Sequence, residues 1–143
     1  VFNHSLTEKI ASVLLAMGSE RAYVVHGSDG LDEITSTGPS QVTELKSDKL
    51  KTFEISPSKF GFDIASPADL KGGTVSDNAR ILTAVLEGKQ GPAKDVVVMN
   101  SALALAVGDL VDDLHSGVNL AEEIIDSGRA LTALEKLREV SNS

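Results

Sequence analysis

The spacing of apolar residues changes from helical to extended near the start of the chain. Between Leu6 and Met17 apolar residues recur at helical spacing, which predicts an amphipathic helix that ends at Gly18. Tyr23 to His26 is a β-branched and aromatic run and predicts a buried strand. We take Val1-Phe2 as the end of a strand whose earlier part is absent, and the chain as a fragment. Strand, helix and strand then form a βαβ unit with a parallel pair. The expected apolar face of the helix consists of Leu6, Ile10, Val13, Leu14 and Met17.

The middle of the chain alternates polar and apolar residues, as half-exposed strands do. Three such runs, Ile34–Thr37, Gln41–Leu45 and Leu50–Ile55, are separated by turn residues and predict antiparallel strands. Residues 56–73 are expected to be mostly irregular, with one helical turn at Pro67–Leu70 because Pro67 suits the first helical position.

Helical periodicity returns in the last half of the chain. Ser76 or Asp77 is expected to cap a helix that ends near Glu87. Its apolar face is expected to contain Ile81, Leu82, Val85 and Leu86. Further helices are predicted over residues 96–107, 120–126 and 130–139. Because no repeat or linker interrupts these patterns, residues 1–143 are expected to form a single α/β unit, a mixed sheet with flanking helices.

The composition excludes several classes of function. Thirteen basic residues against twenty-one acidic ones leave a net charge of −8, which disfavours nucleic-acid binding. The absence of cysteine excludes disulfides and Cys-based zinc sites. No apolar run approaches the roughly 18 residues of a membrane span. We therefore expect a soluble, cytoplasmic protein that binds neither nucleic acid nor membrane.

Two adjacent carboxylates are the main candidates for chemistry. Asp32 and Glu33 follow the predicted strand at 23–26 after a glycine-rich turn, and ligands bind at the carboxyl ends of strands in open α/β sheets. The pair offers hard oxygen ligands of the kind that Mg²⁺ prefers. The alternative is a solvated turn, since surface carboxylates are common. His26 is either a general base or ligand, or a half-buried histidine bonded to a nearby carbonyl group, and we favour the carbonyl-bonded histidine.

Several motifs together resemble those of one enzyme family, the anthranilate phosphoribosyltransferases. HGSDGLDE, residues 26–33, is similar to the family's HG-x-x-GLDE signature. Gly72-Gly73 with Asn78-Ala79 resembles the segment GG…NA, and residues 86–92 resemble L-x-G-x-x-GP. Residues 94–102 are similar to the run RD-x-V-x-x-NA, with Lys94 for the usual Arg and Ser101 for the usual Ala. The closing helices match at Gly117-Val118, Ala121 and Ala130-Leu131.

The resemblance implies a fold, a reaction and a metal. The family's α/β domain, of the nucleoside phosphorylase and phosphoribosyltransferase type, stands beside a smaller helical domain, usually in a homodimer. Its enzymes transfer the phosphoribosyl group from phosphoribosyl pyrophosphate (PRPP) to anthranilate, in tryptophan biosynthesis. The family's adjacent Asp-Glu pair, which is Asp32 and Glu33 here, holds Mg²⁺ at the pyrophosphate. The resemblance therefore favours the metal site over the solvated turn.

The same resemblance implies that this chain is the C-terminal part of a larger catalytic domain. The family's glycine-rich PRPP loop, its second metal segment and its anthranilate-binding arginine precede the part that matches Val1, and none is present in this chain. We expect no measurable phosphoribosyl transfer from the chain alone. Two alternatives remain open: a pyrimidine nucleoside phosphorylase-like enzyme, and a non-catalytic acidic interaction module.

Overall fold

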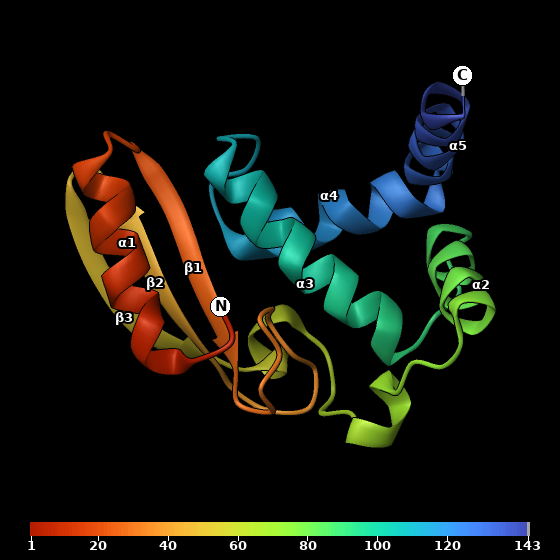
Figure 1. Ribbon diagram of the computed structural model, residues 1–143, viewed down its shortest axis with the longest axis horizontal. Coiled ribbons are helices and arrows are strands. Elements are labelled where there is room, and N and C mark those ends of the chain that lie inside the picture. The colour runs from red at the N-terminus through yellow and green to blue at the C-terminus, as the bar shows by residue number, and fades with distance from the viewer. Residues whose placement is uncertain (143) are drawn as a thin grey trace.

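The computed structural model describes residues 1–142, with a sheet at one end and a group of helices at the other (Figure 1). Within these residues the sheet has three strands, β1 (Arg21–Gly27), β2 (Ser40–Lys46) and β3 (Lys49–Ile55), in the order β1-β2-β3. Both pairings are antiparallel. Helix α1 (Thr7–Ala16) lies along one face of the sheet and contacts all three strands.

The two faces of the sheet have different neighbours. The register pairs Val24 with Thr43 and Val25 with Val42, so these two pairs point to opposite faces. Val42 is buried in the core that the sheet shares with the helical end, and Val25 packs against that core. Val24 and Thr43 are also buried, on the face that α1 covers. The sheet is therefore buried on both sides around its central strand, β2.

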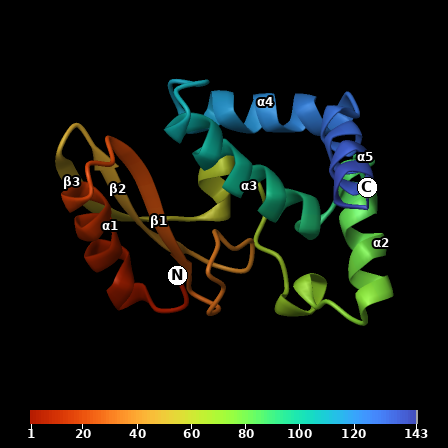
Figure 2. The same cartoon turned by 45° about the horizontal axis from the view of Figure 1, so that its top comes forward.

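The helical end consists of four longer helices. These are α2 (Val75–Leu86), α3 (Pro92–Val107), α4 (Leu114–Asp126) and α5 (Arg129–Ser141). In both ribbon views α3 runs from the far end of the molecule toward the sheet, α4 leads back, and α2 and α5 stand at the far end (Figures 1 and 2). Gly117 allows the close approach of α4 to α3, because a Cβ atom there would lie 2.9 Å from the Ala102 carbonyl oxygen.

One continuous core joins the two ends of the molecule. It is built from the sheet, the loop after β1, the short helix η2 (Pro57–Phe60), α3 and α4. Its buried members are Ile34, Val42, Ile55, Phe60, Val96, Val98, Met99, Ala102, Leu103, Val118, Ala121 and Ile125. Because the loop after β1 contributes Ile34 to this core, the loop is fixed to α3 as well as to the sheet.

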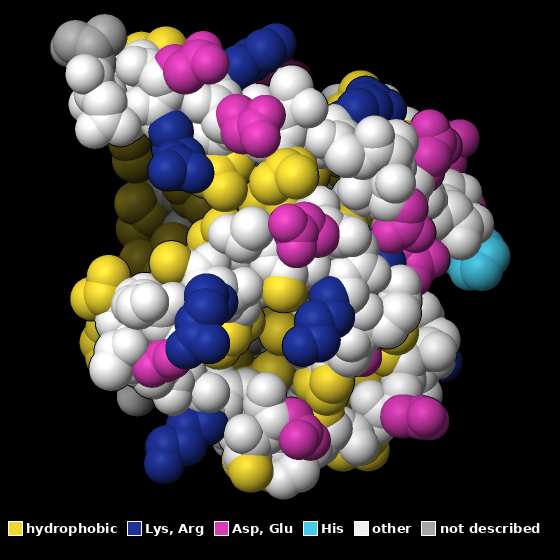
Figure 3. Space-filling view, turned by 90° about the vertical axis from the view of Figure 1, so that its right-hand side faces the viewer, with side chains coloured by type: hydrophobic (Ala, Val, Ile, Leu, Met, Phe, Trp, Pro, Cys, Tyr) yellow, Lys and Arg dark blue, Asp and Glu magenta, His cyan; other side chains and the backbone are white. Residues whose placement is uncertain are grey.

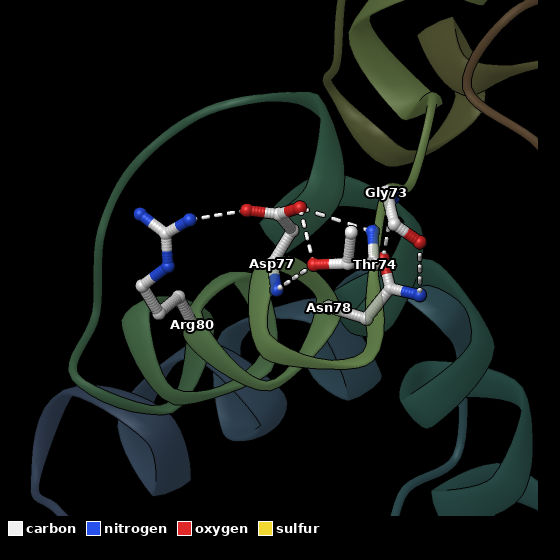
Figure 4. Close-up of polar contacts among 5 residues, drawn as sticks. All are labelled: Gly73, Thr74, Asp77, Asn78 and Arg80. Atoms are coloured by element: carbon white, nitrogen blue, oxygen red, sulfur yellow. Dashed lines mark hydrogen bonds and ion pairs between the residues drawn. The ribbon is translucent and has the colours of Figure 1, made fainter.

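Helix α2 begins with a capping box (Figure 4). The Thr74 hydroxyl accepts a hydrogen bond from Asp77 N (3.3 Å), and the Asp77 carboxylate accepts one from Thr74 N (3.0 Å). Arg80 forms an ion pair with Asp77. The cap is therefore Thr74, one turn before the residues that the sequence indicated, because Asp77 serves as the partner of the cap.

Most of the predicted elements are confirmed. The strand predicted at 23–26 lies within β1, and those at 41–45 and 50–55 lie within β2 and β3. Each predicted helix is present, and the helical turn at Pro67–Leu70 is the short helix η3. Gly18 has a φ of +87°, as expected of a residue that ends a helix in the left-handed region.

The predicted strand Ile34–Thr37 is wrong. These residues form an irregular loop because side chains satisfy their backbone groups in place of a neighbouring strand. Ile34 N donates to Asn100 Oδ1 (2.9 Å), Thr35 N to Ser40 Oγ (3.0 Å) and Thr37 N to Thr35 Oγ1 (3.1 Å). Such local side-chain partners compete with strand pairing.

The predicted parallel pair and mixed sheet are not found within residues 1–142, where the sheet is antiparallel. Val1 lies beside β1, before the short helix η1 (His4–Leu6), and its N atom donates to the Val25 carbonyl group (2.8 Å). The predicted burial of the α1 apolar face is also wrong. That helix packs through the small residues Thr7 and Ala11, which leaves several larger residues exposed, namely Ile10, Val13 and Met17.

The helical end carries an apolar groove. Figure 3 faces α2 and α5 and shows apolar side chains gathered in the hollow between them. The groove measures about 470 Å³, and its lining includes Ile81, Leu82, Val97 and Leu134. Two of the predicted apolar residues of α2, Ile81 and Leu82, are therefore half exposed. Within residues 1–142, no helix is both long and apolar enough to cross a lipid bilayer.

Candidate functional site

The predicted carboxylate pair lies on the loop that joins β1 to β2. Asp32 and Glu33 are both exposed, and they sit just past the carboxyl end of β1, as the sequence predicted. The loop is the orange segment between the sheet and the lower end of α3 in Figure 1. The predicted position of the pair is confirmed. The contacts of the surrounding loop hold the backbone that carries these two exposed side chains.

A tight turn brings the chain back on itself immediately before the pair. Gly30 N donates to the Gly27 carbonyl group (3.0 Å), and Gly27 N donates to the Leu31 carbonyl group (2.8 Å). Gly30 has a φ of +94°, a conformation that residues with a Cβ atom rarely adopt. Ser28 N closes the base of the loop by donating to the Pro39 carbonyl group (3.0 Å). The glycines of the turn therefore serve backbone geometry.

Asp29 ties the start of the loop to its later part. Its Oδ2 atom accepts hydrogen bonds from the hydroxyl groups of Thr35 (2.6 Å) and Thr37 (2.7 Å). Its Oδ1 atom accepts one from Leu31 N (3.2 Å), which forms an Asx-turn. Partial burial raises the pKa of Asp29, but these hydrogen bonds outweigh it and hold the pKa below its usual value. Asp29 is therefore a structural carboxylate.

The atoms around Asp29 pack so closely against position 27 that only glycine fits there. A Cβ atom at position 27 would lie 2.8 Å from Asp29 Oδ1 and 3.1 Å from both the Glu33 carbonyl oxygen and Thr35 Cγ2. These distances are shorter than van der Waals contact allows. The Gly of the His-Gly dipeptide therefore leaves space for the Asp29 carboxylate.

The far side of the pair is held by α3. Asn100 Oδ1 accepts from Ile34 N (2.9 Å), and Asn100 Nδ2 donates to the Ile34 carbonyl group (2.9 Å). The same nitrogen also donates to the Val96 carbonyl group (2.9 Å), one turn earlier in α3. Ile34 directly follows Glu33, so Asn100 holds the backbone at the end of the carboxylate pair. The partner of Asn100 outside α3 is therefore a loop residue 66 positions away in the sequence.

His26 is half buried and bonded to a carbonyl group, as expected. Its Nδ1 atom lies 2.8 Å from the Val1 carbonyl oxygen, and because a carbonyl oxygen only accepts, Nδ1 carries the proton. Val1 N in turn donates to the carbonyl groups of Val25 (2.8 Å) and Asp32 (3.3 Å). His26 and Val1 therefore brace the same loop from the free edge of β1.

The chemistry of the pair fits a metal that takes only part of its ligands from protein. Within residues 1–142, no group of three or more His, Asp or Glu side chains is placed to hold a metal ion. Mg²⁺ typically takes one or two carboxylates and fills its octahedron with water and phosphate oxygens. Two exposed carboxylates on an ordered loop suit that ion, with Asp32 and Glu33 as the residues that would hold it.

Sequence reasoning missed the residues that order the loop. Asp29 was predicted only as part of a turn, and Thr35 and Thr37 were placed in a strand, so the network that joins them was not predicted. The Asp-Gly dipeptide, a turn signal, was the one available sign of the Asx-turn. No local signal links Asn100 to Ile34, since the contact depends on how α3 packs.

Known proteins have sequences similar to this one over all or nearly all of the chain. Residues 1–131 match the family described as "Glycosyl transferase family, a/b domain". An anthranilate phosphoribosyltransferase of Acetivibrio thermocellus is 48% identical over 143 residues, which are 100% of this chain and 41% of that protein. One from Methanosarcina barkeri is 44% identical over 138 residues, 96% of this chain and 37% of that protein.

Solved structures that are similar to this chain are of the same enzyme as these relatives. The crystal structure of anthranilate phosphoribosyltransferase from Thermus thermophilus superimposes with a TM-score of 0.86 at 31% identity, covering 95% of this chain and 40% of that one. The Saccharomyces cerevisiae enzyme in complex with PRPP and Mg gives a TM-score of 0.82 at 32% identity, covering 94% and 39%. The chain thus spans about two-fifths of the length of these relatives. Since the family match extends over residues 1–131, the chain belongs to the glycosyl transferase family and carries its a/b domain fold.

Proposed function

We propose that this chain serves in the transfer of the phosphoribosyl group from PRPP to anthranilate, which gives N-(5-phosphoribosyl)anthranilate and pyrophosphate in tryptophan biosynthesis. The observation that carries the proposal is the ordered loop with its exposed Asp32-Glu33 pair, in a chain 48% identical over its full length to an anthranilate phosphoribosyltransferase. The chain would act as part of a polypeptide of the relatives' full length, because it spans about 41% of that relative.

Asp32 and Glu33 are proposed to hold Mg²⁺ at the pyrophosphate of PRPP. The bound ion would neutralise negative charge that gathers on the departing pyrophosphate. The chain's own contribution is to present two carboxylates, in water, at a fixed place. Exposure avoids the large cost of desolvating two adjacent charges, and the fixed backbone lowers the entropy lost when PRPP and its metal bind.

Three further properties belong to the proposal. Mg²⁺ is favoured as the metal because a yeast relative was solved with PRPP and Mg. Anthranilate is favoured as the acceptor because another structure of that relative holds 4-fluoroanthranilate. A homodimeric state rests on the family resemblance, and a cytoplasmic location rests on the composition of the chain.

The test is the rate of transfer against Mg²⁺ concentration in a polypeptide of the relatives' full length that carries these 143 residues. Asp32→Asn and Glu33→Gln keep the shape of each side chain and remove its charge. By analogy with losing one preorganised electrostatic contact, each should cost about 3–4 kcal/mol, or roughly 10²–10³-fold in rate. Asp112→Asn, which changes an exposed carboxylate between α3 and α4, is the matched control.

The outcome separates the candidate functions. If both substitutions leave the rate and its Mg²⁺ dependence unchanged, the pair is a solvated turn and the proposed metal role is wrong. Transfer of the ribosyl group from uridine to phosphate, with release of uracil, in place of transfer from PRPP to anthranilate, would instead indicate a nucleoside phosphorylase. An interaction module would show no metal-dependent turnover with either substrate pair.

A further inference from the structure

Both polar atoms of the Asn100 amide group form hydrogen bonds to Ile34, the residue that follows the carboxylate pair. The amide oxygen accepts from Ile34 N, while the amide nitrogen donates to the carbonyl groups of Ile34 and Val96, all at 2.9 Å. A flipped amide would set nitrogen against the Ile34 N–H and oxygen against two carbonyl groups. The amide therefore has one allowed orientation, and it fixes both polar groups of one loop residue.

The bond to Ile34 N acts directly on Glu33. That nitrogen belongs to the peptide unit between Glu33 and Ile34, and because peptide units are planar, fixing the N–H also fixes the Glu33 carbonyl group. On the other side of the pair, the Leu31 carbonyl group, which belongs to the peptide unit before Asp32, accepts from Gly27 N (2.8 Å). The backbone that carries both carboxylates is therefore held at its two ends, by Gly27 N and by the Asn100 amide, while both side chains are exposed.

The Ile34 side chain makes the attachment rigid. It is 1% exposed and lies in the core with Val96 and Met99 of α3. Ile34 is thus tied to α3 twice, by apolar packing and by the Asn100 amide. A movement of α3 relative to the sheet would carry the end of the carboxylate pair with it.

We propose that Asn100 is a positioning residue for the metal-binding pair, which orders the Glu33-Ile34 peptide so that Asp32 and Glu33 receive Mg²⁺ and pyrophosphate without rearrangement. This inference rests on the proposed function. Asn100 itself touches neither carboxylate side chain in the contacts that the described residues make, and its effect passes through the backbone of Ile34. Groups that orient metal ligands in this way typically contribute 10–100-fold to metal affinity.

The chain offers a matched control for Asn100. Asn78 of α2 holds Gly73 in the same manner, with Gly73 N donating to its Oδ1 atom (2.9 Å) and its Nδ2 atom donating to the Gly73 carbonyl group (3.4 Å) (Figure 4). Both asparagines thus attach a helix to the backbone of a loop residue, but only Asn100 is adjacent to the carboxylate pair. Asn78→Ala removes the same kind of contact elsewhere.

The experiment is calorimetric titration of Mg²⁺ into the full-length polypeptide in the presence of pyrophosphate, without turnover. Asn100→Ala and Asn100→Leu should weaken binding by about 10–100-fold, whereas Asn78→Ala should not. Leu fills the volume of Asn without its hydrogen bonds, so it preserves packing if Ala destabilises the fold. In kinetic assays the two Asn100 variants should need more Mg²⁺ for half-maximal rate while the KM for anthranilate stays unchanged.

Hydrogen exchange of the unsubstituted protein tests the same inference without variants. The Ile34 amide should be protected before any ligand is added, and Mg²⁺ with pyrophosphate should leave that protection unchanged. Protection that arises only on binding would overturn the inference, as would equal losses in the Asn100 and Asn78 variants. If Asp32→Asn and Glu33→Gln weaken Mg²⁺ binding but the Asn100 variants do not, the inference fails and the proposed function stands. If none of them weakens binding, the metal role itself fails.

Discussion

The Gly27→Ala substitution tests the packing of the carboxylate loop most directly. The new methyl group would lie 2.8 Å from Asp29 Oδ1 and 3.1 Å from the Glu33 carbonyl oxygen, so one of the two must move. The Asp29 carboxylate cannot move freely, because the hydroxyl groups of Thr35 and Thr37 and the Leu31 amide donate to it. Gly27→Ala therefore either displaces the Glu33 peptide or breaks the Asp29 network.

The expected loss is about 2 kcal/mol in the free energy of unfolding, within the roughly 1–3 kcal/mol that overpacking costs. Urea denaturation of the chain, with and without Asp29→Ala, measures it. Because Asp29→Ala removes the closest atom, the cost of Gly27→Ala should fall by about 1 kcal/mol in that background. A loss below about 0.5 kcal/mol for Gly27→Ala alone, the range of ordinary surface changes, would refute this account of the loop.

Three further predictions concern backbone strain, the ion pair of a buried lysine and acid pH. Gly30→Ala and Gly18→Ala both place a Cβ atom at positive φ in open space, at +94° and +87°, so each should cost about 1–2 kcal/mol in urea denaturation. Only Gly30→Ala should also weaken Mg²⁺ binding with pyrophosphate. Lys94 is 2% exposed and its Nζ atom lies 2.8 Å from Asp126 Oδ1, so Asp126→Ala should cost about 1–3 kcal/mol in the same assay. Since the folded-state pKa of Asp29 is lowered, its contribution to stability is present above the unfolded value of 3.8 and is lost as pH falls through the folded value. The difference in unfolding free energy between the protein and Asp29→Asn should therefore be constant near neutral pH and shrink below about pH 3.8.

The helices and the three strands of the sheet were predictable because their causes are local. Apolar periodicity, glycine at helix ends and turn residues between strands lie within a few positions of the elements that they set. The α1 helix was predicted for this reason, but not its buried side. The face of α1 that contacts the sheet contains the small residues Thr7 and Ala11, which allow close approach. The periodicity of large apolar residues does not predict which small residues make this contact.

The position of the carboxylate pair could be predicted from the sequence, but the contacts that hold its backbone could not. Asp32 and Glu33 follow a recognisable strand and turn, so their place at the end of β1 followed from the sequence. The contact between Asn100 and Ile34 joins residues 66 positions apart and exists only because Ile34 enters the core beside α3. The alternation of apolar and polar residues over 34–37 suggested a half-exposed strand, but Ile34, Thr35 and Ser36 are all buried. Side-chain partners satisfy the backbone of this loop, so no neighbouring strand is needed.

A site of this kind has to be exposed and ordered at once. Burying Asp32 and Glu33 would order them, but it would desolvate two adjacent charges at a cost that only a permanently bound ion offsets. In this chain the side chains of the pair stay exposed, and contacts of the backbone on either side of the pair fix its position. Before it, Asp29 and the turn at Gly30 fix the approach of the chain, and after it Ile34 is fixed by the core. Both attachments come from residues within this chain, so the order of the loop that carries the proposed metal ligands is a property of these residues.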